Sequence, residues 1–111
     1  MILKEKTELS DIQAFEPAYF DDMVKIVIDR KRQIIAVHSE MHSDLGIELY
    51  DDGSDDEDLY GANIYYDDHS IEWSSTLNVA RNREYGIRGR VLKDENLIIE
   101  LTDIVNRWIY R

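Results

Sequence analysis

Residues 23–37 read Met-Val-Lys-Ile-Val-Ile-Asp-Arg-Lys-Arg-Gln-Ile-Ile-Ala-Val, and they hold the strongest strand signal of the chain. Val and Ile dominate residues 23–29, as is typical of a strand that is buried on both faces. The polar residues Arg30, Lys31 and Arg32 interrupt this pattern and predict a turn. A strand from Gln33 then returns as the second arm of a hairpin. This stretch therefore predicts an antiparallel pair of strands.

The second strand is predicted to run to Ser43, or to Tyr50 if a bulge forms near Gly46. Its apolar residues keep one parity, which favours an extended chain: Ile35, Val37, Met41, Leu45, Ile47 and Leu49. A short helix over 43–50, with Ser43 as its N-cap, is the alternative. Gly46 would weaken such a helix.

In the extended conformation His38, Glu40, His42 and Asp44 share one strand face, because successive side chains alternate. Imidazole and carboxylate groups suit a divalent metal ion such as zinc, iron or manganese, or acid–base chemistry. Alternate strand residues lie about 7 Å apart, so two of the four and a ligand from another strand are the realistic set. A solvated face with imidazoles beside carboxylates is the more common outcome. It would raise the pKa of His42.

The flanking sequence predicts a helix at each end of the chain. Thr7 or Ser10 can cap the first helix, whose apolar stripe is Leu9, Ile12 and Phe15. Asp94 caps the last helix. The apolar stripe of that helix is Leu97, Leu101, Ile104, Val105 and Trp108.

Two further strands are predicted between the helices, over residues 59–66 and 71–79. Gly61 marks a bulge or a close approach of backbones in the first of them. The second alternates apolar and polar residues and places Trp73 toward the core. We therefore expect an α+β fold in a single domain, 1–111. It consists of a mostly antiparallel sheet of four or five strands, with the N-terminal and C-terminal helices packed on one face.

The net charge of −11 is concentrated in the middle of the chain. Residues 33–80 contain 12 carboxylates and no Lys or Arg. The densest part is an acidic loop, defined here as Asp51, Asp52, Asp55, Asp56, Glu57 and Asp58. This charge repels nucleic acid and attracts cations or a basic protein. The basic residues Arg81, Arg83, Arg88 and Arg90 follow in a second predicted loop, and we expect them to pair with the acidic middle or with another copy of the chain.

Three blocks of sequence resemble a known family. They are Glu40-Met41-His42-Ser43-Asp44, Asp52-Gly53-Ser54, and Asp58-Leu59-Tyr60-Gly61-Ala62-Asn63-Ile64-Tyr65. They are similar to a family of small prokaryotic proteins catalogued as domain of unknown function 5674. The similarity extends from the first helix to residues 104–106, but residues 80–92 lack a proline expected there, and Tyr66 stands where a proline often follows. The resemblance implies no activity.

Composition limits the remaining functional classes. Cysteine is absent, which excludes disulfides and fits a reducing compartment. Neither a signal-length nor a membrane-length apolar run is present, so we expect a cytoplasmic protein without membrane contact. We favour a non-enzymatic module that binds a basic protein and needs no cofactor. The alternative is a metal-dependent enzyme that uses the residues from His38 to Asp44. The sequence determines neither the partner nor the oligomeric state.

Overall fold

The computed structural model describes residues 1–74 and 94–111, and it shows an α+β fold. The described elements follow one another as β1 (Thr7–Glu8), α1 (Leu9–Gln13), β2 (Met23–Asp29), β3 (Ile34–Val37), α2 (His42–Asp51), the 3₁₀ turn η1 (Asp56–Asp58), β4 (Leu59–Tyr65), β5 (Ile71–Ser74), α4 (Glu95–Trp108) and β6 (Ile109–Tyr110). The predicted strands β2 and β4 are confirmed, and so are the terminal helices.

Four antiparallel strands form the main sheet in the order β3-β2-β4-β5. The β2–β3 hairpin is confirmed, with Ile28 opposite Ile35. Strand β4 pairs with all of β2 from Asp29↔Leu59 to Met23↔Tyr65 in one unbroken register, so the bulge proposed at Gly61 is absent from this pair. A separate parallel pair joins β1 to β6. Strand β2 is thus hydrogen-bonded along both edges, and its predicted burial on both faces is confirmed.

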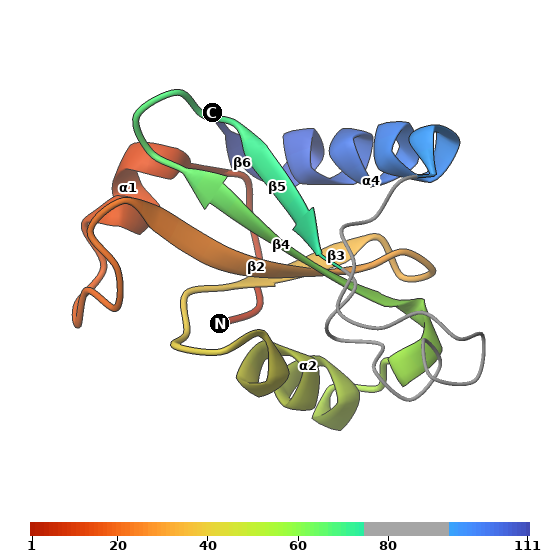
Figure 1. The fold of residues 1–111 in the computed structure, drawn as a ribbon. Coiled ribbons are helices and arrows are strands. Elements are labelled where there is room, and N and C mark those ends of the chain that lie inside the picture. The colour runs from red at the N-terminus through yellow and green to blue at the C-terminus, as the bar shows by residue number, and fades with distance from the viewer. Residues whose placement is uncertain (75–93) are drawn as a thin grey trace.

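The sheet separates two hydrophobic cores, because alternate side chains of each strand point to opposite faces. Ile26 and Ile28 of β2 pack in the larger core, to which α1 and α4 contribute. Val27 packs in the smaller core with Leu45 and Leu49 of α2. Helix α2 therefore covers the face opposite α1 and α4, which the sequence did not lead us to expect (Figure 1).

Helix α4 follows the predicted pattern closely. The Asp94 carboxylate accepts a hydrogen bond from the Leu97 backbone N–H at 3.1 Å, which confirms the predicted N-cap. The central residues of the stripe, Leu101, Ile104 and Val105, are buried. Trp108 is only partly buried, and its indole N–H donates to the Gln33 carbonyl oxygen at 2.8 Å. The positions of both tryptophans in apolar patterns predict that they are largely buried, which is confirmed for Trp73 at 6% exposure, whereas Trp108 is only partly buried.

The predicted cap of α1 is wrong. Thr7 lies in β1 and pairs with Ile109, so tertiary strand pairing draws it away from the helix end. The N-cap is Glu8, whose carboxylate makes no capping hydrogen bond to the helix, and Ser10 lies inside the first turn, where its hydroxyl donates to Glu8 at 3.5 Å. The apolar stripe is nonetheless used as predicted, since Leu9 and Ile12 are buried.

The long second strand is also wrong. Strand β3 ends at Val37, His38 adopts a positive φ of 71°, and residues His42–Asp51 form α2. The helical alternative was closer, although the N-cap is Met41 rather than Ser43. Leu45 and Leu49 are four residues apart, so one helix face can bury both against the sheet. Tertiary burial therefore overrides the alternating pattern.

Two predictions fall on residues that the structure does not describe. Strand β5 is present over Ile71–Ser74, and the rest of the predicted strand, 75–79, lies outside the described residues. The loop of Arg81, Arg83, Arg88 and Arg90 also lies outside them. Among the helices that the structure describes, none combines the length and the apolarity needed to cross a membrane.

Candidate functional site

The structure does not give the predicted row of His38, Glu40, His42 and Asp44 a common strand face, because only Ile34–Val37 is extended. Asp44 accepts a hydrogen bond from the Ser39 hydroxyl at 3.0 Å, and Glu40 is exposed. In the described part of the chain, these four residues contribute to no group of three metal-binding side chains. The two histidines instead enter different environments.

His38 lies in an aromatic setting beside the loop that follows α1. Its ring centroid is 5.5 Å from that of Phe15, in an edge-on arrangement, and 4.8 Å from that of Tyr19. Its Nε2 atom is buried without a hydrogen-bond partner among the described residues. Burial lowers the pKa of His38, and the N-terminal ammonium lowers it further against weaker opposing effects of Pro17 and Glu16. His38 therefore acts as a neutral packing residue.

His42 is the first residue of α2, and its side chain contacts strand β4 of the sheet. Its Nε2 lies 2.8 Å from the Ala62 carbonyl oxygen, which can only accept, so this nitrogen carries a proton, and in the neutral imidazole Nδ1 has the lone pair. Burial lowers the pKa of His42 and Lys25 adds to this, whereas the Ala62 carbonyl and the side chains of Asn63 and Glu72 oppose it. The condition for a raised pKa, an exposed strand face shared with Glu40 and Asp44, is not met, and burial has the larger effect on His42.

Lys25, Asn63 and Glu72 lie side by side on the same sheet face, since Asn63 is registered with Lys25 on β2 and with Glu72 on β5. With His42 and Tyr65, they form what we call the sheet-face cluster. The Asn63 amide donates to Glu72 Oε1 at 2.9 Å, and the Tyr65 hydroxyl donates to the same oxygen at 3.3 Å. Sequence reasoning missed this cluster, because its members come from four separate elements.

The cluster contains one unsatisfied group. Asn63 is only 8% exposed, and its Oδ1 has no hydrogen-bond partner among the described residues. Reversing the Asn63 amide would place its Oδ1 against the Glu72 carboxylate, and two acceptors would then face each other. The present orientation, in which the amide nitrogen donates to Glu72, is therefore the favourable one. A buried acceptor left unpaired costs free energy. The sheet-face cluster therefore contains a buried acceptor without a hydrogen-bond partner among the described residues.

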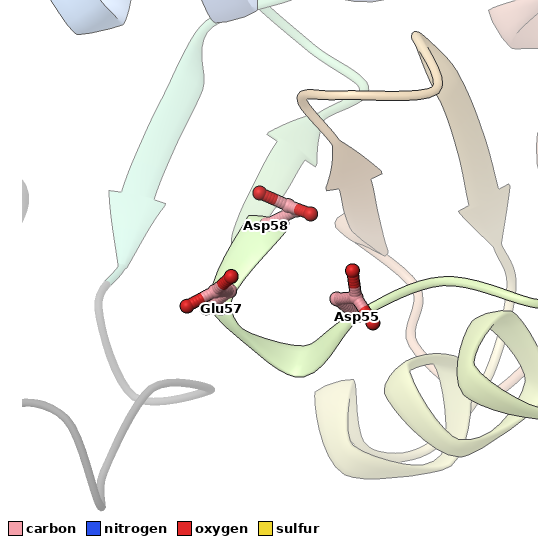
Figure 2. Close-up of side chains that lie close together, drawn as sticks. All are labelled: Asp55, Glu57 and Asp58. Atoms are coloured by element: carbon pink, nitrogen blue, oxygen red, sulfur yellow. The ribbon is translucent and has the colours of Figure 1, made fainter.

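The acidic loop runs from the end of α2 into β4, and Figure 2 shows three of its side chains. One ligand oxygen from each of Asp55, Glu57 and Asp58 lies within 4.8 Å of the others. The backbone here is ordered by the hairpin, since Arg30 N–H donates to the Asp58 carbonyl oxygen at 2.9 Å. Exposed carboxylates often gather without an ion, and this cluster alone does not define a metal site.

Arg32 fixes the other end of the acidic loop. Its guanidinium donates to the hydroxyl of buried Ser54 and to the Asp52 carboxylate, both at 2.8 Å. Between these two residues, Gly53 adopts a φ of 110°, which suits glycine. The hydrogen bond with Arg32 holds the pKa of Asp52 below its usual value. One carboxylate of the loop is therefore compensated within the chain.

The outer surface of α2 combines apolar and acidic side chains. Met41, Ile47 and Tyr50 are exposed by 57%, 60% and 58%. Asp44 and Asp51 lie on the same exposed side of the helix. We call these five residues the outer α2 surface.

Lowering the pH from 7.5 to 5 is expected to destabilise the protein through His38 and His42. The unfolded chain binds protons at the ordinary histidine pKa of about 6.5, whereas both folded pKa values are lower. The contribution of these two histidines to the free energy of unfolding is therefore fully present above about pH 6.5. It is lost as the pH falls toward the folded pKa values. Urea unfolding across this interval measures the effect.

His38→Asn removes one titrating group and tolerates the positive φ at this position. We expect it to flatten the pH dependence between 7.5 and 5. His69→Asn is the matched control, because His69 also has a positive φ, of 61°, but is exposed. If His38→Asn and His42→Gln together kept the full dependence of the wild type, the assignment to these two histidines would be wrong.

Comparison with known proteins gives one match. The model of the family described as "Protein of unknown function (DUF5674)" covers residues 1–108, and the chain belongs to this family. Searches of curated proteins and of solved structures gave no match. Membership confirms the resemblance noted from the motif blocks and assigns no activity. Of the sheet-face cluster, His42, Asn63 and Tyr65 lie within those blocks.

Proposed function

We propose that this protein is a non-enzymatic binding module that takes a basic protein partner through the acidic middle of its chain. The observation that carries the proposal is the exposure of the carboxylates of α2 and of the acidic loop, of which only Asp58 is half-buried. Among the described residues, two ion pairs involve this region: Glu48 with the N-terminal ammonium and Asp52 with Arg32. Asp44, Asp51, Asp55 and Asp56 form no ion pair with another described residue.

Uncompensated surface carboxylates act on a partner at a distance. They raise the association rate of a basic protein and repel phosphate groups of nucleic acids and anionic lipids. Their mutual repulsion also destabilises the compact state, so a bound basic protein would relieve a cost that the free protein bears. A protein of the opposite charge is thus the partner that this surface fits best, and it would act in the cytoplasm without a cofactor.

A fluorescent lysine-rich peptide is expected to bind the protein at low salt and to dissociate as the Debye length falls toward about 10 Å. Fluorescence anisotropy measures both. The combined variant Asp51→Asn, Asp55→Asn, Asp56→Asn should weaken binding by about tenfold or more, in line with the loss of several rim charges. Asp103→Asn, which removes an exposed carboxylate of α4, is the control and should bind like the wild type. Equal binding by all three proteins would overturn the proposal.

A metal-dependent or acid–base activity is the second candidate, and the unpaired Oδ1 of Asn63 favours it. His42 Nδ1, Asn63 Oδ1 and the Glu72 carboxylate offer nitrogen and oxygen ligands of the kind that zinc and manganese accept. NMR titration of the three histidines with zinc tests this candidate. Stoichiometric perturbation of His42 that spares His69 would support the metal-dependent enzyme, and unchanged spectra would exclude it.

A further inference from the structure

The outer α2 surface has no role in the packing of the described residues. Helix α2 already buries Leu45 and Leu49 against the sheet, at 1% and 0% exposure. Ile47 and Tyr50 lie three residues apart on the side turned to solvent, where each exposes more than half of its surface. Large apolar side chains that are exposed together are typical of an interaction surface.

Charge restricts what can cover this surface. Asp44 and Asp51 flank Ile47 at the helical spacings of three and four residues, and both are exposed. Glu48 is turned aside, since it pairs with the N-terminal ammonium at 3.0 Å and accepts from the Ile2 N–H. A second copy would bring carboxylates against carboxylates, and an anionic membrane or a nucleic acid would be repelled.

We propose that the outer α2 surface docks a basic amphipathic helix of a partner protein. The apolar side of that helix would cover Ile47, Tyr50 and Met41, and its Lys or Arg side chains would face Asp44 and Asp51. In an amphipathic helix, apolar and charged side chains recur every three or four residues. The apolar and acidic residues of α2 around Ile47 have the same spacing. This inference rests on the proposed function. It specifies the outer α2 surface as the binding surface and an amphipathic helix as the part of the partner that binds.

Two synthetic peptides of identical composition separate the inference from the proposed function. One places Leu and Lys on opposite sides of a helix, and the other has the same residues in a scrambled order without an apolar face. Isothermal titration at moderate salt should show the amphipathic peptide binding about tenfold more tightly than the scrambled one.

Variants locate the contact. The combined variant Ile47→Ser, Tyr50→Ser should lose about tenfold in affinity for the amphipathic peptide, since exposed anchors of this size carry much of an interface. Ile99→Ser is the matched control, because Ile99 is 61% exposed on α4, on the opposite face of the sheet. It should bind like the wild type. Circular dichroism verifies that each variant is folded, as expected for exposed positions.

Each other outcome overturns the inference in a distinguishable way. If both peptides bind equally and the double variant binds like the wild type, the acidic surface attracts basic chains without this docking site, and the proposed function stands. If neither peptide binds, both proposals fail. If sedimentation shows a wild-type dimer that the double variant loses, a second copy covers the surface instead.

Discussion

Trp73→Ala is expected to lower the free energy of unfolding by about 3–5 kcal/mol, the usual loss for deleting a buried large aromatic side chain. Trp73 is 6% exposed and packs in the larger core. Its registered neighbour on β4 is Ala62, a small residue that leaves room for the indole. The total stability of such a domain is about 5–15 kcal/mol, so the loss is a large part of it.

Urea unfolding followed by far-ultraviolet circular dichroism measures this change, with Trp108→Ala for comparison. Trp108 is partly exposed, so its removal deletes less buried surface and one hydrogen bond to Gln33. We therefore expect a smaller loss than for Trp73→Ala. A Trp73→Ala variant with the same urea midpoint as the wild type would show that β5 does not pack as described.

Leu49→Ala is expected to lower the free energy of unfolding by about 2–5 kcal/mol, because Leu49 is fully buried in the smaller core. Its partners there are Val27 of β2, Ala36 of β3 and Leu59 of β4, so the cavity would open beneath three strands. The change tests whether α2 is docked on the sheet, which the sequence alone did not establish.

Ile47→Ala is the matched control on the same helix. Ile47 is 60% exposed, and alanine favours the helix, so the free energy of unfolding should change by less than about 0.5 kcal/mol. Urea unfolding of the two variants under one set of conditions gives the comparison. Equal losses at positions 47 and 49 would contradict the orientation of α2.

Sequence reasoning succeeded where the local pattern and the final burial agree. The Val- and Ile-rich strand β2 is buried on both faces, and its hairpin with β3 forms as predicted. Helix α4 has an N-cap and an apolar stripe within one segment, so no distant residue is needed to recognise it. Both elements are identified by residues close together in the chain.

The same reasoning failed over residues 38–50, for a definable reason. Val37, Met41, Leu45 and Leu49 are four residues apart, a spacing that fits both the two-residue period of a strand and the turn of a helix. Local sequence therefore could not separate the two conformations. The helix forms because the sheet presents Val27, Ala36 and Leu59, against which one side of α2 can be buried.

The candidate site divides in the same way. The sequence by itself determined the acidic middle of the chain and the residue types available for chemistry, because charge and composition do not depend on folding. Only the tertiary structure decided which of these side chains lie in contact with one another. Strand register aligns Lys25, Asn63 and Glu72, and the first turn of α2 brings His42 to them. Burial there lowers the pKa of His42, although carboxylates stand beside it in the sequence, since contact in a fold follows packing rather than chain order.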